Sequence, residues 1–397
     1  MAEAMVGRQR MVSWRRLVAL AAASLVAACS TVVPKGPPPP VTRPVERPTT
    51  TAPIQGGIPA DNDRDRVALL VPLTGPNAGV GKSIANATQM ALLDTGSAKV
   101  RITTYDTNGG AAAAATRALA DGNKLFLGPL LSEDVKAIEP IADRAHVPII
   151  TFSNDSSVAG DGVYLLGYVP SQAIDRVVSY AKSRGVTTFG GLVPNGLYGQ
   201  RASTAFLRAV EDAGGQVVSL QTYDRSAAAV KTAVGRLAKD GPFGAVLIAD
   251  SGATAAMIAP GVKKATSADT RLLGTELWNS ESAIASKPGL NGAWFASVPD
   301  DLYRQYAVKY RSRFGAAPYR LSSLGYDAVL LTVRIARDWR PGSDFPESAL
   351  HDSGGFSGID GVFRFGRDGI AERGLEVQEI RDGHTVVVSP APTSFGK

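Results

Sequence analysis

Buried-strand patterns alternate with helical patterns along most of the chain, and this alternation constrains the fold more than any other feature. Val67–Leu73 reads VALLVPL, a continuous apolar run typical of a strand buried on both faces. Apolar residues then recur at helical spacing over 83–93. Further strands are expected at 100–105, 125–128 and 147–152, with helices at 111–120 and 134–144. Repeated strand–helix–strand units predict a parallel sheet with helices on both of its faces.

A second series of the same kind begins after a break near residue 168. Its expected strands are 186–193, 216–223, 244–249, 271–273 and 293–297, and its expected helices include 174–182, 200–213 and 227–239. Two such series predict an α/β protein with two doubly wound, Rossmann-like lobes. Two long helical patterns follow at 302–314 and 323–339. Residues 361–365 and 375–381 depart from this alternation of strand and helix patterns, and we interpret them as an antiparallel hairpin.

The N-terminal segment predicts export. Arg15 and Arg16 precede the apolar run Leu17–Ala28, which is followed by Cys29. This run is shorter than the roughly 20 residues that a membrane-spanning helix needs, and its length and basic flank are typical of a secretory signal. Its end, LVAAC, resembles the lipobox of bacterial lipoproteins. That resemblance implies that residues 1–28 are removed and that Cys29 is lipidated, anchoring the protein to a membrane. A plain signal peptide with an incidental cysteine is the alternative.

The next segment is unusually rich in proline. Residues 34–59 contain nine prolines, and such a stretch favours extended polyproline II over packed structure. We therefore expect 29–65 to be a disordered tether that carries the lipidated cysteine at its start. It is either a plain linker or a device for reaching a partner across the cell wall. Ser30 stands where an aspartate would indicate inner-membrane retention, so outer-membrane delivery is permitted.

Composition excludes several classes of function. One cysteine and three histidines exclude a disulfide framework and a Cys/His zinc cluster. The net charge is +6, of which +3 belongs to residues 1–28, and the remaining +3 is too small to indicate a nucleic-acid partner. We expect no metal and no cofactor.

The turn after the first strand matches only part of the phosphate-binding loop motif. Gly81, Lys82 and Ser83 match the end of that motif, but Pro76 occupies the position of its first glycine. Backbone N–H groups must converge on one phosphate for the loop to work, so the spacing argues against nucleotide hydrolysis. The chain also contains no Gly-x-Ser-x-Gly elbow. We predict that the protein is not an enzyme.

Several motifs in the same order resemble the type 1 periplasmic binding proteins of the Leu/Ile/Val-binding kind. The segments that carry the resemblance, within 66–388, are Val67–Pro76, Leu127–Pro129, Pro148–Asn154, Leu197–Gly199 and Gly358–Phe365. The resemblance implies two lobes joined by three crossovers, near Tyr168, Val298 and Pro341. The first lobe would then comprise 66–168 plus 299–341, and the second 169–298 plus 342–397.

The resemblance also implies a ligand held between the lobes, at the carboxyl ends of the strands where open α/β sheets bind their ligands. Ser132 and Ser153 would receive a ligand carboxylate, and Asp250 or Glu276 an ammonium group. Ser132 and Ser251 equally fit helix N-cap positions. The candidate ligand-binding residues are Thr74, Asn77, Ser132, Ser153, Asn154, Ser156, Tyr198, Asp250, Glu276 and Trp278.

Two functions share this fold and remain open at this point. One is the receptor of an ABC-type importer, which captures a small, amino-acid-like solute and presents it to a permease. The other is a lipoprotein activator of a penicillin-binding protein, which uses the same two lobes to bind a protein involved in peptidoglycan synthesis. Both are non-catalytic, periplasmic and lipid-anchored.

Overall fold

The computed structural model describes residues 63–280 and 283–395. Within these ranges no helix combines the length and the apolar character needed to cross a membrane. The expected signal peptide, Cys29 and the proline-rich tether lie outside the described residues.

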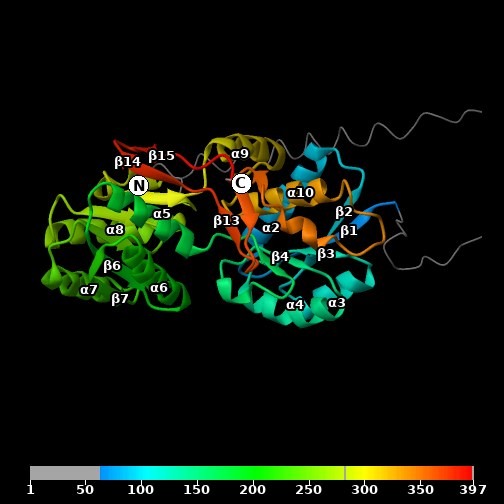
Figure 1. Ribbon diagram of the computed structural model, residues 1–397, viewed down its shortest axis with the longest axis horizontal. Helices are drawn as coiled ribbons and strands as arrows, with labels where there is room; N and C mark the ends of the chain where they lie inside the picture. Colours follow the sequence, from blue (N-terminus) through cyan, green and yellow to red (C-terminus); the bar gives the residue numbers. More distant parts are fainter. Residues whose placement is uncertain (1–62, 281–282, 396–397) are drawn as a thin grey trace, which may run out of the picture. The chain divides into compact units, whose positions relative to one another are not determined.

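The first lobe is built on a five-stranded parallel sheet with the strand order β2-β1-β3-β4-β5 (Figure 1). Its strands are β1 (Asp65–Val71), β2 (Val100–Asp106), β3 (Leu125–Leu127), β4 (Ile149–Thr151) and β5 (Val163–Leu165). The four predicted strands are confirmed. The fifth strand, β5, was not predicted, because three apolar residues between glycine-rich turns carry no recognisable period.

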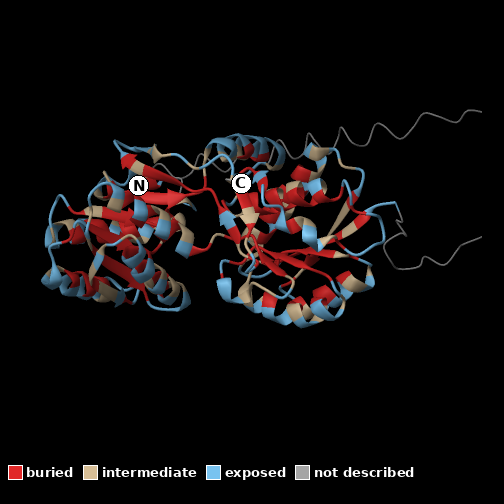
Figure 2. Cartoon of the chain, viewed as in Figure 1, coloured by how far each residue is buried: buried red, intermediate tan, exposed pale blue. Residues whose placement is uncertain are grey.

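Helices cover both faces of this sheet. Helices α2 (Ala78–Thr95) and α10 (Ser322–Ile335) pack against one face, and α3 (Ala111–Ala120) and α4 (Ser132–Arg144) cover the other (Figure 1). Helix α9 (Asp301–Phe314) packs its tyrosines against α2. Figure 2 shows the strands buried and the outer sides of the helices exposed, as expected for a doubly wound lobe.

Gly81, part of the near-miss phosphate-binding motif, has a packing role. A β-carbon at this position would lie 1.8 Å from the carbonyl oxygen of Pro72. Only glycine therefore lets α2 approach the end of β1 so closely.

The second lobe contains a seven-stranded sheet with the order β15-β14-β10-β9-β8-β6-β7. Its strands are β6 (Thr188–Pro194), β7 (Gln216–Tyr223), β8 (Ala245–Ile248), β9 (Arg271–Gly274), β10 (Trp294–Ser297), β14 (Glu376–Arg381) and β15 (His384–Ser389). The first five run parallel, and β14 and β15 add an antiparallel edge. Helices α5 (Pro170–Ser183) and α6 (Leu197–Asp212) pack on one face, and α7 (Ala227–Asp240) and α8 (Gly252–Ala265) on the other. The predicted fold class is confirmed.

The C-terminal region corrects two expectations. Residues 361–365 and 375–381 do not pair with each other: the first forms β12 of a separate three-stranded antiparallel sheet, and the second lies mostly in β14 of the second lobe. The aromatic residues Phe345, Phe356 and Phe363 pack into the first lobe's core beside α10, so residues 345–371 belong with the first lobe. The third crossover consequently lies between Arg373 and Glu376 and not near Pro341.

The remaining elements are short. The small sheet consists of β11 (Phe356–Gly358), β12 (Gly361–Phe365) and β13 (Ala371–Arg373). The 3₁₀ turns are η1 (Ser156–Val158), η2 (Glu276–Ser280), η3 (Ile284–Ser286), η4 (Pro288–Leu290) and η5 (Glu347–His351). Of these, η1 follows β4 and η2 follows β9, so both lie at the carboxyl ends of strands, where a ligand site is expected.

Candidate functional site

A buried network of charged and hydroxyl groups ties the first crossover to the first lobe. Asp360, in the turn before β12, is fully buried and pairs with Arg320 Nη1 at 2.7 Å. Ser323 Oγ donates to the same carboxylate at 2.8 Å, and the hydroxyl of Tyr168 also donates to it. Although burial opposes ionisation, Arg320 and Arg373 lower the pKa of Asp360 below its usual value. We call Tyr168, Arg320, Ser323 and Asp360 the hinge network.

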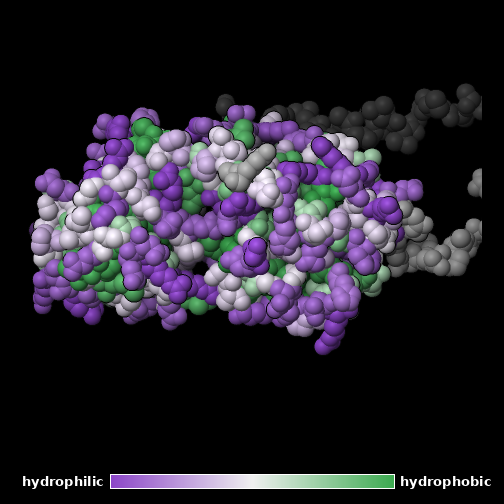
Figure 3. Space-filling model, viewed as in Figure 1, coloured by the Kyte–Doolittle hydropathy of each residue, from purple (hydrophilic) through white to green (hydrophobic). Residues whose placement is uncertain are grey.

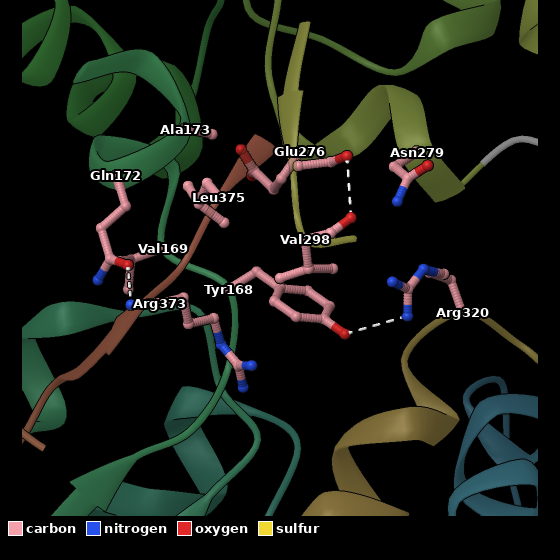
Figure 4. Close-up of a pocket in the computed structure, with 11 residues that line it drawn as sticks. Tyr168, Val169, Gln172, Ala173, Glu276, Asn279, Val298, Arg320, Arg373 and Leu375 are labelled. Carbon is pink, nitrogen blue, oxygen red and sulfur yellow. Dashed lines mark hydrogen bonds between the residues drawn. The ribbon is translucent and has the colours of Figure 1, made fainter. Parts of the chain in front are cut away.

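A small cavity lies beside the hinge network. In Figure 4 the ring of Tyr168 lies between the guanidinium groups of Arg320 and Arg373, and Glu276 and Asn279 of the second lobe lie beyond Val298. The cavity volume is about 20 Å³, which is room for roughly one water molecule. It is therefore far too small to hold a free amino acid.

Glu276 and Tyr198 come together in the second lobe, as the candidate site requires. The Tyr198 hydroxyl donates to Glu276 Oε1 at 3.1 Å and lies 3.0 Å from Thr275 Oγ1. Glu276 Oε2 is buried and has no hydrogen-bond partner among the described residues. Burial raises the pKa of Glu276 to about 7. The carboxyl group is thus partly protonated at neutral pH.

Asp250 has partners of its own. It accepts a hydrogen bond from the Tyr223 hydroxyl at 2.8 Å. Arg225 holds both carboxylate oxygens, with Nε 3.1 Å from Oδ2 and Nη2 3.1 Å from Oδ1. Because this bidentate arginine already neutralises the carboxylate, Asp250 is a poor binding site for a ligand ammonium group. Ser251 caps α8 by accepting from the Thr254 amide at 3.2 Å, as its N-cap position suggested.

Trp278 belongs to the core of the second lobe. Its side chain is fully buried, it packs against Phe295 at a ring-centroid distance of 6.0 Å, and it fills the space beside Gly274. The ring presents no surface to a ligand, so Trp278 is not retained in the site. An aromatic residue directly after a strand has the same sequence pattern whether it packs inward or over a cleft.

The candidate residues of the first lobe lie near strand ends, and the hydrogen bonds of Thr74 and Ser153 are made within the turns there. Thr74 is exposed, and its hydroxyl donates to Asp106 Oδ2 at 2.7 Å. Ser153 is buried and accepts from the Asp155 amide at 3.1 Å. Ser132 is the first residue of α4, and the N-cap position that its sequence pattern suggested is occupied by Leu131. Three further candidates are at least partly exposed near strand ends: Asn77, Asn154 and Ser156.

An ion pair between the two lobes was not predicted. Arg201, in the second turn of α6, pairs with Asp155, which follows the carboxyl end of β4. Arg201 Nη2 also donates to Ser157 Oγ at 3.2 Å. The side chain of Asp155 is 3% exposed and that of Arg201 is 23% exposed. Burial alone would raise the pKa of Asp155, but hydrogen bonds from Ser157 and the charge of Arg201 lower it below its usual value. We call this contact the cross-lobe ion pair.

A groove runs beside the cross-lobe ion pair. It has a volume of about 480 Å³, lies between α5 and α6, and is bounded on the first-lobe side by Ser156 and Ile370. This volume is within the range of ligand sites. We call it the α5–α6 groove. Its charged lining residues are Asp175, Arg201, Arg208 and Asp212. No single sequence motif indicated it, because its walls come from parts of the chain far apart in sequence.

Comparison with known proteins decides the family. The profile of the family described as "Periplasmic binding protein" matches residues 66–385. The chain belongs to this family. The family and fold are those of non-catalytic binding proteins. Among the described residues, no group of three or more His, Cys, Asp or Glu side chains is placed to hold a metal ion.

Several solved structures share this fold at low identity. A putative branched-chain amino acid ABC transporter protein from Rhodospirillum rubrum is 19% identical, covering 82% of this chain and 100% of its own, with a TM-score of 0.73. A leucine binding protein, LivK, from Thermotoga maritima is 18% identical, covering 82% and 98%, with a TM-score of 0.64. LpoA from Haemophilus influenzae is 18% identical, covering 83% of this chain and 60% of its own, with a TM-score of 0.63.

One curated relative was found by sequence. An uncharacterized protein of Rickettsia prowazekii is 28% identical over 170 residues. The match covers 42% of this chain and about half, 46%, of that relative.

Proposed function

We propose that this chain is a lipid-anchored, non-catalytic periplasmic protein that binds a protein partner, in the manner of the lipoprotein activators of penicillin-binding proteins. The cross-lobe ion pair carries this proposal. Arg201 and Asp155 join the two lobes directly at the carboxyl ends of β6 and β4, where a solute receptor would hold its solute. A protein whose lobes bind each other is suited to present a surface to a partner.

The state of the other charged groups supports the same function. Asp250 is already neutralised by Arg225, and the cavity beside the hinge network has room for only about one water molecule. Hydrophilic residues cover most of the face seen in Figure 3. The lipobox-like end of the signal and the proline-rich tether fit a protein anchored at a membrane that reaches a partner at a distance.

A solute receptor for an ABC-type importer is the second candidate, and one observation favours it. Among the residues that the structure describes, none donates to the buried Glu276 Oε2 beside Tyr198, so this carboxyl group has free capacity to accept from a ligand ammonium group. Several structural relatives are named as branched-chain amino acid or leucine-binding proteins.

Two measurements on the full chain separate these functions. Surface plasmon resonance against purified penicillin-binding proteins from the same organism measures partner binding. Thermal unfolding with a panel of amino acids and short peptides measures solute binding, because a ligand at about 100 times its Kd adds roughly 2.7 kcal/mol. Saturable synthase binding with a flat solute panel supports the activator function. A solute that raises the unfolding midpoint by several degrees, with no synthase binding, overturns it.

A further inference from the structure

One face of α6 forms a wall of the α5–α6 groove. The lining residues of this helix are spaced at helical intervals, so they share one side of it. They are Leu197, Gln200, Arg201, Thr204, Ala205, Arg208, Ala209 and Asp212. The opposite wall is the first turns of α5, from Pro170 to Asp175. Since Ser156 and Ile370 belong to the first lobe, anything bound here contacts both lobes.

The charges along this wall are separated by sign. Arg201 and Arg208 are two helical turns apart, and Asp212 follows one turn later; Asp175 of α5 also lines the groove. Burial and the charge of Asp212 raise the pKa of Asp175, while the charge of Arg176 lowers it. Among the described residues, Arg208, Asp175 and Asp212 form no salt bridge. The groove therefore has Arg201 at the end beside the cross-lobe ion pair and Asp212 at the end away from it, with Arg208 one turn from Asp212.

We propose that the α5–α6 groove seats an extended segment of the protein partner, with an acidic residue at the Arg201 end and a basic residue at the Asp212 end. This inference rests on the proposed function. Arg201 and Asp212 are eleven residues apart on a helix, or about 16 Å along its axis. An extended segment covers that distance in about five residues.

Binding of such a segment makes Arg201 exchange partners. The partner's carboxylate competes with Asp155 for the guanidinium group. Asp155 does not lose all its partners in the exchange, because it keeps hydrogen bonds from the Ser157 amide at 2.8 Å and from Ser157 Oγ. The cross-lobe ion pair is thus an internal competitor. Removing the charge of Asp155 should tighten partner binding, which is the opposite of what a purely structural ion pair predicts.

The test uses the full chain and a fluorescent octapeptide. The peptide has aspartate at its second position, lysine at its seventh, and serine or glycine at the other positions. Fluorescence anisotropy measures its Kd, and a neutral peptide with asparagine and glutamine at those positions is the control. We expect the charged peptide to bind at least about fivefold more tightly than the neutral one, because it gains an ion pair at each end of the groove. Arg201→Gln and Asp212→Asn should remove this preference, and Arg311→Gln, an exposed arginine of α9, should keep it.

The decisive variant is Asp155→Asn, which should tighten binding of the charged peptide by about fivefold or more. Arg201→Lys, which keeps the charge, should retain part of the preference and shows that the loss in Arg201→Gln is not a folding defect. Equal binding of charged and neutral peptides, or unchanged or weaker binding by Asp155→Asn, overturns the inference. Synthase binding by the wild-type chain is measured in parallel. If the synthase binds and the peptides do not discriminate, the inference fails alone; if no synthase binds, the proposed function fails.

Discussion

The hydroxyl of Tyr168 donates a hydrogen bond to Asp360, a residue 192 positions later in the chain. Tyr168 lies in the first crossover between the lobes, and Asp360 precedes β12 of the first lobe. Arg320 joins the same carboxylate at 2.7 Å, in surroundings from which water is largely excluded. The hinge therefore depends on buried ionic contacts that only the folded chain brings together.

Asp360→Asn should be strongly destabilising. It leaves the buried guanidinium of Arg320 without its main counter-ion, and breaking one side of a buried ion pair typically costs about 3–5 kcal/mol. Urea unfolding followed by circular dichroism measures the change. Asp352→Asn is the matched control, because it breaks the exposed ion pair with Arg334 and should cost less than about 1 kcal/mol. Equal losses in the two variants would contradict the role given to the hinge network.

Stability should fall as pH rises towards neutrality. Burial raises the pKa of Glu276 and of Glu376 to about 7, well above the values of the unfolded chain. Between about pH 4.5 and 7 the folded state therefore binds more protons than the unfolded state, and the unfolding free energy decreases with pH. The contribution of these two groups to the free energy of unfolding is fully present below about pH 4.5 and is lost as the pH rises through about 7.

Urea unfolding at pH 5, 6, 7 and 8 tests this dependence. Glu276→Gln should flatten the slope, because its amide does not titrate. Exposed Glu211→Gln is the control and should leave the slope unchanged. A wild-type stability that is level or rises over this window would show that these carboxyl groups ionise normally in the folded protein.

Gly81→Ala should destabilise the first lobe. The added methyl group would lie 1.8 Å from the Pro72 carbonyl oxygen, so α2 must move away from β1. Overpacking of this kind typically costs about 1–3 kcal/mol. Gly235→Ala in α7 is the opposite case: nothing lies within 4 Å of the added carbon, and the substitution should stabilise by up to about 1 kcal/mol. Thermal unfolding of both variants gives the comparison, and a neutral Gly81→Ala would contradict the close approach.

Cys29→Ser should release the protein from the membrane. Without the thiol no diacylglyceryl group can be attached, and the tether then has no anchor. Fractionation of cells expressing the full chain, followed by immunoblotting, measures the distribution between membrane and periplasm. Ser30→Ala is the control that leaves lipidation in place. Membrane association that persists in Cys29→Ser would mean that the lipobox-like motif does not anchor this protein.

Local patterns in the sequence were enough to predict the architecture. Buried parallel strands such as Val67–Leu73 consist of continuous apolar runs, and their helices have a regular period, so each element can be recognised from its neighbours alone. The same holds for Ser251, whose capping role depends on residues three positions away. The antiparallel C-terminal region was predicted less well, because pairing between strands that are distant in sequence leaves no local signal. β12 and β14 accordingly belong to different sheets.

The candidate site shows the same division. The sequence by itself determined the strand ends that carry Tyr198, Asp250 and Glu276, because turns at the carboxyl ends of parallel strands follow from the order of the elements. Only the tertiary structure decided that Trp278 points into the core and that Asp250 is held by Arg225. It also brought Arg201 to Asp155 across the lobes. The physical reason is that charge pairing and burial depend on distances between residues far apart in the chain, and no local pattern encodes those distances.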